Sequence, residues 1–114
     1  MYRRRPKNKY GNHPVVADGV RYDSEKEYAR WCELKLLQKA GVIKDLQRQV
    51  KFELQPSFYF NGKKIQAINY IADHTYYDQD GNYIVEDVKG VKTREYINKK
   101  KQMMYIHNIE IKEV

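Results

Sequence analysis

Asp87 and Lys89 place a carboxylate and an ammonium group two residues apart, a spacing that could direct both toward one substrate. Residues 83–89 around them are rich in Ile, Val and Tyr, a composition that favours a strand. Side chains two residues apart on a strand project from the same face, so the acid and the lysine are expected to share a surface. Taken alone, they could equally form an exposed ion pair of little energetic value.

Asp73 supplies a second acid in the preceding apolar stretch, residues 65–77. The pair Asp80-Gly81 lies between the two stretches and favours a tight turn, so the stretches are predicted to form a hairpin. Cross-strand neighbours in a hairpin approach closely enough to share a ligand. The sequence therefore predicts that two acids and a lysine converge on one patch of sheet.

Two carboxylates held close together repel each other and favour the binding of a cation between them. Hard oxygen ligands suit Mg²⁺, with Mn²⁺ as a substitute, and either ion lowers the pKa of a bound water and neutralises charge on a phosphoryl oxygen. A neighbouring lysine can orient the attacking water or stabilise the transition state. Zinc is not expected, because His13, His74 and His107 lack metal-ligand spacing.

A helix is predicted before these strands. Residues 15–22 favour a short hairpin around Asp18-Gly19, and Ser24 with Glu27 has the form of a capping box that would begin a helix. Good helix formers continue to residue 40, and Gly41 is suited to end the helix in the left-handed conformation.

The remaining segments predict further strands and one more helix. Residues 45–55 alternate between apolar and polar side chains, which is typical of a strand with one wet face, and Asn61-Gly62 predicts another hairpin. Residues 93–107 favour a second helix with Thr93 as its N-cap, and residues 109–114 alternate as a final strand. The expected fold class is α/β: helix, three-stranded antiparallel meander, helix, strand.

The 114 residues predict one domain, residues 14–114, preceded by a basic flexible arm, residues 1–13. The net charge of +7 is segregated, with an acidic stretch at residues 73–87 between two basic stretches. Basic side chains facing a polyanion release its counterions, so we expect DNA as the partner. The candidate DNA contacts are Arg3, Arg4, Arg5, Lys7, Lys9, Lys92, Lys99 and Lys100.

This arrangement resembles the PD-(D/E)XK nuclease superfamily: one acid, Asp73, is followed after a gap by the acid-x-Lys motif of Asp87 and Lys89, in a hairpin between two helices. Ala72 stands where that name has proline. More narrowly, the chain resembles small phage-encoded proteins related to Holliday junction resolvases. The segments that carry this resemblance are Tyr22-Asp23-Ser24-Glu25-Lys26-Glu27, Gln47-Arg48-Gln49-Val50, Tyr70-Ile71-Ala72-Asp73 and Glu86-Asp87-Val88-Lys89-Gly90-Val91-Lys92-Thr93.

The resemblance implies a restriction-endonuclease-like core. It also implies a Mg²⁺-dependent endonuclease that hydrolyses DNA phosphodiester bonds. The implied substrate is branched or Holliday-junction DNA in phage recombination or replication. The resemblance also implies a further acid on the first helix that completes the metal site with Asp73 and Asp87. Glu27 fits the Ser-x-x-Glu form, and Glu25 is its competitor. Glu27 could instead serve only as a capping residue.

Several neighbouring residues are assigned supporting roles. Gln49 projects from the strand that faces the hairpin and is expected to orient a water or the lysine. His74 is assigned to the surroundings of the metal site rather than to its ligands. Glu86 points away from Asp87 and is expected to be a paired, semi-buried acid, with a role as an alternate ligand left open.

The single cysteine, Cys32, cannot form an internal disulfide, and no apolar run is long enough to cross a bilayer. We therefore expect a cytoplasmic protein of a phage-infected bacterium, with no membrane association and no small-molecule cofactor. Cutting two related strands requires a two-fold assembly, which predicts a homodimer. The competing hypotheses are a catalytically inactive nuclease-like protein that only binds nucleic acid, and a small basic RNA-binding protein.

Overall fold

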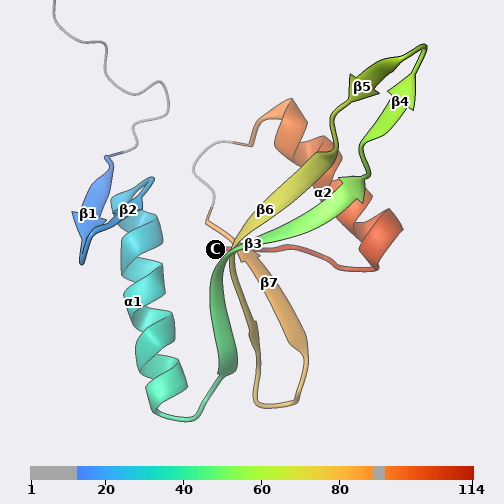
Figure 1. Cartoon of the computed structure of the whole chain (residues 1–114). Coiled ribbons are helices and arrows are strands. Elements are labelled where there is room, and N and C mark those ends of the chain that lie inside the picture. Colours follow the sequence, from blue (N-terminus) through green and yellow to red (C-terminus); the bar gives the residue numbers. More distant parts are fainter. Residues whose placement is uncertain (1–12, 89–91) are drawn as a thin grey trace, which may run out of the picture.

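The computed structural model describes residues 13–88 and 92–114 (Figure 1). The elements follow one another as β1 (Val15–Ala17), β2 (Val20–Tyr22), α1 (Glu25–Lys39), β3 (Lys44–Gln55), β4 (Phe58–Phe60), β5 (Lys63–Ile65), β6 (Ile68–Tyr77), β7 (Tyr83–Asp87), α2 (Arg94–His107) and β8 (Lys112–Glu113). The expectation of a mixed α/β protein is confirmed.

The principal sheet has four strands in the order β3-β6-β7-β8. The first three form an antiparallel meander, and β8 pairs in parallel with β7 after the chain has passed through α2. Two further ribbons, β1-β2 and β4-β5, pair only within themselves. The second of these lies between β3 and β6 in the sequence and projects from the end of the sheet (Figure 1).

Helix α1 begins at the predicted N-cap. The Ser24 hydroxyl accepts a hydrogen bond of 3.1 Å from the Glu27 backbone N–H, as a capping box requires. The reciprocal half differs from the prediction, because the Glu27 carboxylate accepts from the backbone N–H of Asp23, at 3.2 Å, rather than from Ser24. The helix ends at the Ala40 C-cap, and Gly41 follows with the predicted positive φ of 78°.

Strand β3 has the predicted alternation, with its wet face exposed and its apolar face half-buried or buried. Its backbone is irregular at Gln49, which has a φ of 55° in the left-handed region. Arg48 pairs with His74 and Val50 with Ala72, so Gln49 lies across from Asp73. The kink therefore falls where β3 passes the candidate site.

The predicted hairpin of residues 65–77 and 83–89 is confirmed with shifted ends. Ile65 belongs to β5 rather than to the hairpin, because the Asn61-Gly62 turn pairs it with Phe58. Strand β7 ends at Asp87, so the predicted extension to residue 88 is wrong, and residue 89 lies outside the described part of the chain.

The core has two apolar clusters, one for each helix. Tyr96 and Met103 of α2 pack with buried side chains from β3, β6 and β7 and with Ile111. Leu34 of α1 packs with Ile43 and Tyr76 in the second cluster. Helix α2 thus packs against the first half of β6 and α1 against its end. The candidate site lies between these two clusters.

Helix α2 begins after the predicted N-cap Thr93, whose hydroxyl accepts from the Tyr96 backbone N–H, and ends at Asn108 in the left-handed conformation. The predicted final strand of residues 109–114 is shorter, since only Lys112–Glu113 pair with β7. None of the helices in the part of the chain described is long and apolar enough to cross a membrane.

Candidate active site

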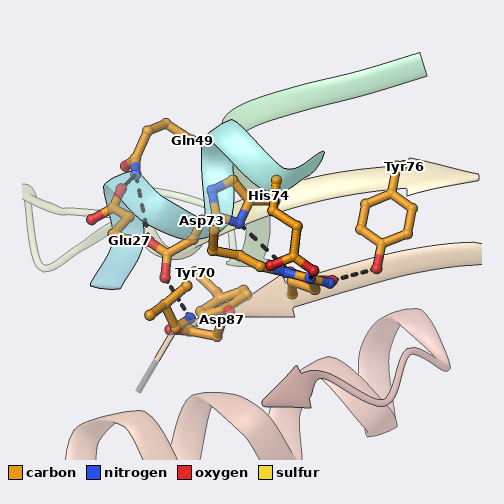
Figure 2. A network of polar contacts seen from close by, with 11 residues as sticks. Glu27, Gln49, Tyr70, Asp73, His74, Tyr76 and Asp87 are labelled. Atoms are coloured by element: carbon orange, nitrogen blue, oxygen red, sulfur yellow. Dashed lines mark hydrogen bonds and ion pairs between the residues drawn. The ribbon is translucent and has the colours of Figure 1, made fainter. Parts of the chain in front are cut away.

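Asp73 and Asp87 meet where strands β6 and β7 separate. Among the described residues, the pairing between these strands runs from the turn to His74 and Glu86. One position further, the Asp73 carboxylate accepts a hydrogen bond of 2.7 Å from the Val88 backbone N–H (Figure 2). A side chain thus replaces the strand ladder at this point and directs the Asp73 carboxylate toward the end of β7.

The Asp87 carboxylate is buried, with 4% of the residue exposed. Its Oδ2 atom accepts a hydrogen bond of 2.5 Å from the Tyr70 hydroxyl, which reaches it from β6. A short hydrogen bond of this kind fixes the direction of the carboxyl group. Tyr70 therefore positions Asp87 beside Asp73.

Asp73 occupies an environment that disfavours its charge. Burial of the carboxyl group, followed by the negative charge of Asp87, raises the pKa of Asp73 to about 7. The hydrogen bond from Val88 opposes this rise, while the charge of Glu27 adds to it. The charged neighbours that raise the pKa of Asp73 are both acids, Asp87 and Glu27. A bound cation would relieve their repulsion.

Glu27 joins the site through Gln49. The Gln49 side-chain amide lies 3.2 Å from Glu27 Oε1 and 3.5 Å from Asp73 Oδ1, so it bridges the helix acid and the strand acid (Figure 2). Arg48 donates to the same Glu27 oxygen at 3.2 Å, which leaves this buried carboxylate with a cationic partner. Glu25 is exposed and takes no part in these contacts.

Two residues of the site offer the oxygen ligands that a hard divalent cation prefers. Asp73 and Asp87 provide oxygen ligands from adjacent strand ends, and Mg²⁺ is commonly held by one or two carboxylates with water and phosphate completing its shell. Glu27 is paired with Arg48 and lies beyond Gln49. Across residues 13–88 and 92–114, no group of three or more His, Cys, Asp or Glu side chains is arranged to hold a metal ion.

Glu86 is a paired acid, as predicted, and belongs to a second network, but it is fully buried rather than semi-buried. It accepts from Arg30 Nε at 2.9 Å and Arg30 Nη2 at 2.5 Å, and also from the Tyr76 hydroxyl. Burial alone would raise the pKa of Glu86, but hydrogen bonds led by that from Arg30 lower it to about 2. His74 belongs to this network, because its Nδ1 atom lies 3.7 Å from Glu86 Oε1, and its ring stacks on Trp31.

The candidate DNA-binding lysines of the described chain are paired with acids. Lys92 and Lys100 both contact Glu113, at 3.1 and 3.2 Å, and Lys99 contacts Glu95 at 3.0 Å. Glu113 is the register partner of Asp87 on β8, so the two lysines lie along the strand next to the candidate site. The predicted residues outside the described part of the chain are Arg3, Arg4, Arg5, Lys7, Lys9 and Lys89.

Comparison with known proteins places the chain in one family. A family model described as "Protein of unknown function (DUF1064)" matches residues 7–113. The chain belongs to the DUF1064 family. Neither the curated proteins nor the solved structures contain a match.

Sequence reasoning missed three residues of this DUF1064 site: Tyr70, Arg48 and Glu113. Arg48 left a detectable signal, because it interrupts the apolar face of β3 with a charge that needs a partner. Tyr70 left none, since its contact with Asp87 depends on how the strands are paired and twisted. Glu113 required knowledge that β8 lies next to β7.

Proposed function

We propose that the chain is a metal-dependent endodeoxyribonuclease that hydrolyses DNA phosphodiester bonds. The observation that carries the proposal is the pair of carboxylates, Asp73 and Asp87, at the end of two adjacent strands, where burial and then the charge of Asp87 raise the pKa of Asp73. Lys89 follows Asp87 by two residues, the spacing found in the PD-(D/E)XK superfamily that the sequence resembles.

The order of elements supports the same assignment. A helix, an antiparallel meander, a second helix and a strand parallel to the last meander strand correspond to α1, β3-β6-β7, α2 and β8. This order agrees with the restriction-endonuclease-like core that the resemblance implies. The acids lie on the meander, where that core would carry its metal ligands.

The residues of the chain would have distinct roles. Asp73 and Asp87 would hold Mg²⁺, or Mn²⁺ in its place, and Glu27 would act on the site through Gln49. The bound ion would lower the pKa of a water molecule and neutralise charge on a phosphoryl oxygen. Lys89 would orient the attacking water, and Tyr70 holds Asp87 in position by the hydrogen bond to Oδ2.

The substrate would be branched or Holliday-junction DNA, cut by a homodimer. A folded unit of this size offers little surface for reading base sequence, so DNA structure is the more suitable feature to recognise. Two related strands require two active sites, and a two-fold dimer supplies them.

A second candidate is a nuclease-like protein that binds DNA without cutting it. The observation that favours it is the pairing of Glu27 with Arg48, which leaves two acids rather than three available in the described residues. The two candidates differ in whether the carboxylates of Asp73 and Asp87 serve chemistry.

The deciding experiment measures cleavage of branched, duplex and single-stranded DNA with Mg²⁺, with Mn²⁺ and with EDTA. We expect cleavage with either ion and none with EDTA. Asp87→Asn and Lys89→Ala should abolish cleavage in folded protein, whereas Asp80→Asn, in an exposed turn, should leave the rate unchanged. Full cleavage in EDTA, or cleavage by folded Asp87→Asn at the wild-type rate, would overturn the proposed mechanism. Binding without cleavage under every condition would support the second candidate.

A further inference from the structure

The β4-β5 ribbon exposes aromatic side chains that the fold does not use. Tyr59 and Phe60 are 73% and 64% exposed, and Phe58 is 42% exposed. The ribbon pairs with no other strand of the described residues and extends beyond the ends of β3 and β6 (Figure 1). Burying the exposed apolar area of these side chains against another molecule would be favourable, so the ribbon is suited to bind a partner.

The charge of the ribbon indicates the chemistry of that partner. Lys63 pairs across the ribbon with Phe60 on one face, and Lys64 pairs with Tyr59 on the other, so each face carries an exposed ring with a cation beside it. Residues 56–66 contain no acid. Aromatic rings alternating with lysines suit nucleic-acid bases, which stack on rings while the cations contact the phosphates.

A hollow of about 750 Å³ continues from the base of the ribbon toward the body of the protein. It lies between the beginning of β6 and the outer face of α2, and it carries amide and lysine side chains. The residues that line it are Ala67, Ile68, Asn69, Glu95, Asn98, Lys99, Lys101 and Gln102. Glu95 pairs with Lys99 in this hollow, so its net positive charge comes from Lys101. That charge and the donors of the side-chain amides suit a phosphate backbone.

We infer that the two faces of the β4-β5 ribbon stack unpaired bases of a DNA strand whose backbone follows the hollow toward Asp73 and Asp87. This inference rests on the proposed function for its choice of DNA and adds the feature of DNA structure that is recognised. It accounts for the exposed rings, the neighbouring lysines and the acid-free ribbon together.

The geometry sets the distance between the stacking surface and the acids. Asp73 lies five positions after Ile68 on β6, and an extended strand rises about 3.3 Å per residue, so that part of β6 spans about 17 Å. The rings lie beyond the beginning of β6. At the rise of stacked DNA, about 3.4 Å per nucleotide, this span corresponds to about five nucleotides between the recognised bases and the scissile bond.

The test compares binding to three DNAs of one sequence: a duplex, the same duplex ending in a splayed, unpaired arm, and the single strand. Binding is measured by fluorescence anisotropy with the full chain in EDTA, so that no cleavage is required. Tyr59→Ala/Phe60→Ala removes the two most exposed rings of the ribbon. Met104→Ala/Tyr105→Ala is the matched control, because it removes exposed side chains of comparable size from α2.

We expect Tyr59→Ala/Phe60→Ala to weaken binding to the splayed and single-stranded DNA by at least about tenfold and to the duplex by less than about threefold. The control variant should bind all three like wild type. Equal weakening for duplex and splayed DNA, or no weakening, would overturn the inference. A further outcome would also overturn it. If wild type sediments as a dimer, the ribbon variant sediments as a monomer, and both bind DNA equally, the ribbon is a self-association surface.

The outcome is separable from that of the proposed function. Selective loss of splayed-arm binding together with no cleavage in Mg²⁺ or Mn²⁺ would support the ribbon inference and overturn the nuclease proposal. Cleavage that proceeds without any effect of the ribbon variant on binding would do the reverse.

Discussion

Replacing Asp73 by Asn should make the metal-free protein more stable, and the gain should grow with pH. The unfolded chain releases the Asp73 proton near the ordinary pKa of 3.8, whereas the folded protein releases it near about 7. Between these values the folded state holds more protons than the unfolded state, so the stability of wild type falls as pH rises. Asn keeps the shape and the oxygen that accepts from Val88 but has no proton to lose.

The separation of the two pKa values sets the size of the effect. It corresponds to at most about 4 kcal/mol once the folded carboxyl group is ionised. We expect a gain near zero at about pH 4 and on the order of 2 kcal/mol at about pH 8, since local rearrangement relieves part of the repulsion with Asp87. The assay is urea denaturation of both proteins in EDTA across this range.

Asp78→Asn is the matched control with the opposite sign. Hydrogen bonds from the backbone N–H groups of Asn82 and Asp80 lower the pKa of Asp78, with that from Asn82 the larger. An acid with a lowered pKa stabilises the fold above its unfolded pKa, and this stability is lost as pH falls. The control should therefore show no gain at high pH. A gain for Asp73→Asn that is absent, or equal at low and high pH, would refute the reasoning about repelling carboxylates.

Three further outcomes follow from the same contacts. Mg²⁺ added at about pH 8 should raise the urea midpoint of wild type but not of Asp87→Asn, and an equal rise in both would exclude Asp87 as a ligand. Arg30→Met leaves the buried Glu86 carboxylate without its main partner and should cost about 3 kcal/mol in denaturation, whereas Glu33→Gln, which removes the exposed partner of Arg30, should cost less than about 0.5 kcal/mol. Deleting residues 1–9, which hold five basic residues and no acid, should weaken DNA binding and make its salt dependence shallower; an unchanged salt slope would exclude the arm as a phosphate contact.

Local signals were sufficient to predict the elements of the fold. The turns at Asp18-Gly19 and Asn61-Gly62 and the N-caps at Ser24 and Thr93 involve residues within three positions of one another. Their conformation depends on backbone preferences that neighbouring side chains impose, so the sequence determines them without reference to the rest of the chain. The ends of strands were predicted less well, because pairing decides them.

The meeting of Asp73 and Asp87 was also within reach of the sequence. Both lie on one hairpin, and the turn between them restricts the register to a narrow choice. What the hairpin could not reveal is that, in the described part of the chain, pairing reaches only His74 and Glu86, and that the Asp73 side chain accepts a hydrogen bond from the Val88 N–H.

Tertiary structure alone decided the partners of the buried charges. Arg30 and Glu86 are 56 residues apart, and their pairing requires α1 to cross the sheet at one particular place. Glu27 was recognised as a capping residue from its neighbours, yet Arg48 and Gln49 of β3 also direct its carboxylate. Such contacts depend on the packing of elements distant in the sequence, because a buried charge takes whichever partner the fold brings within hydrogen-bond distance.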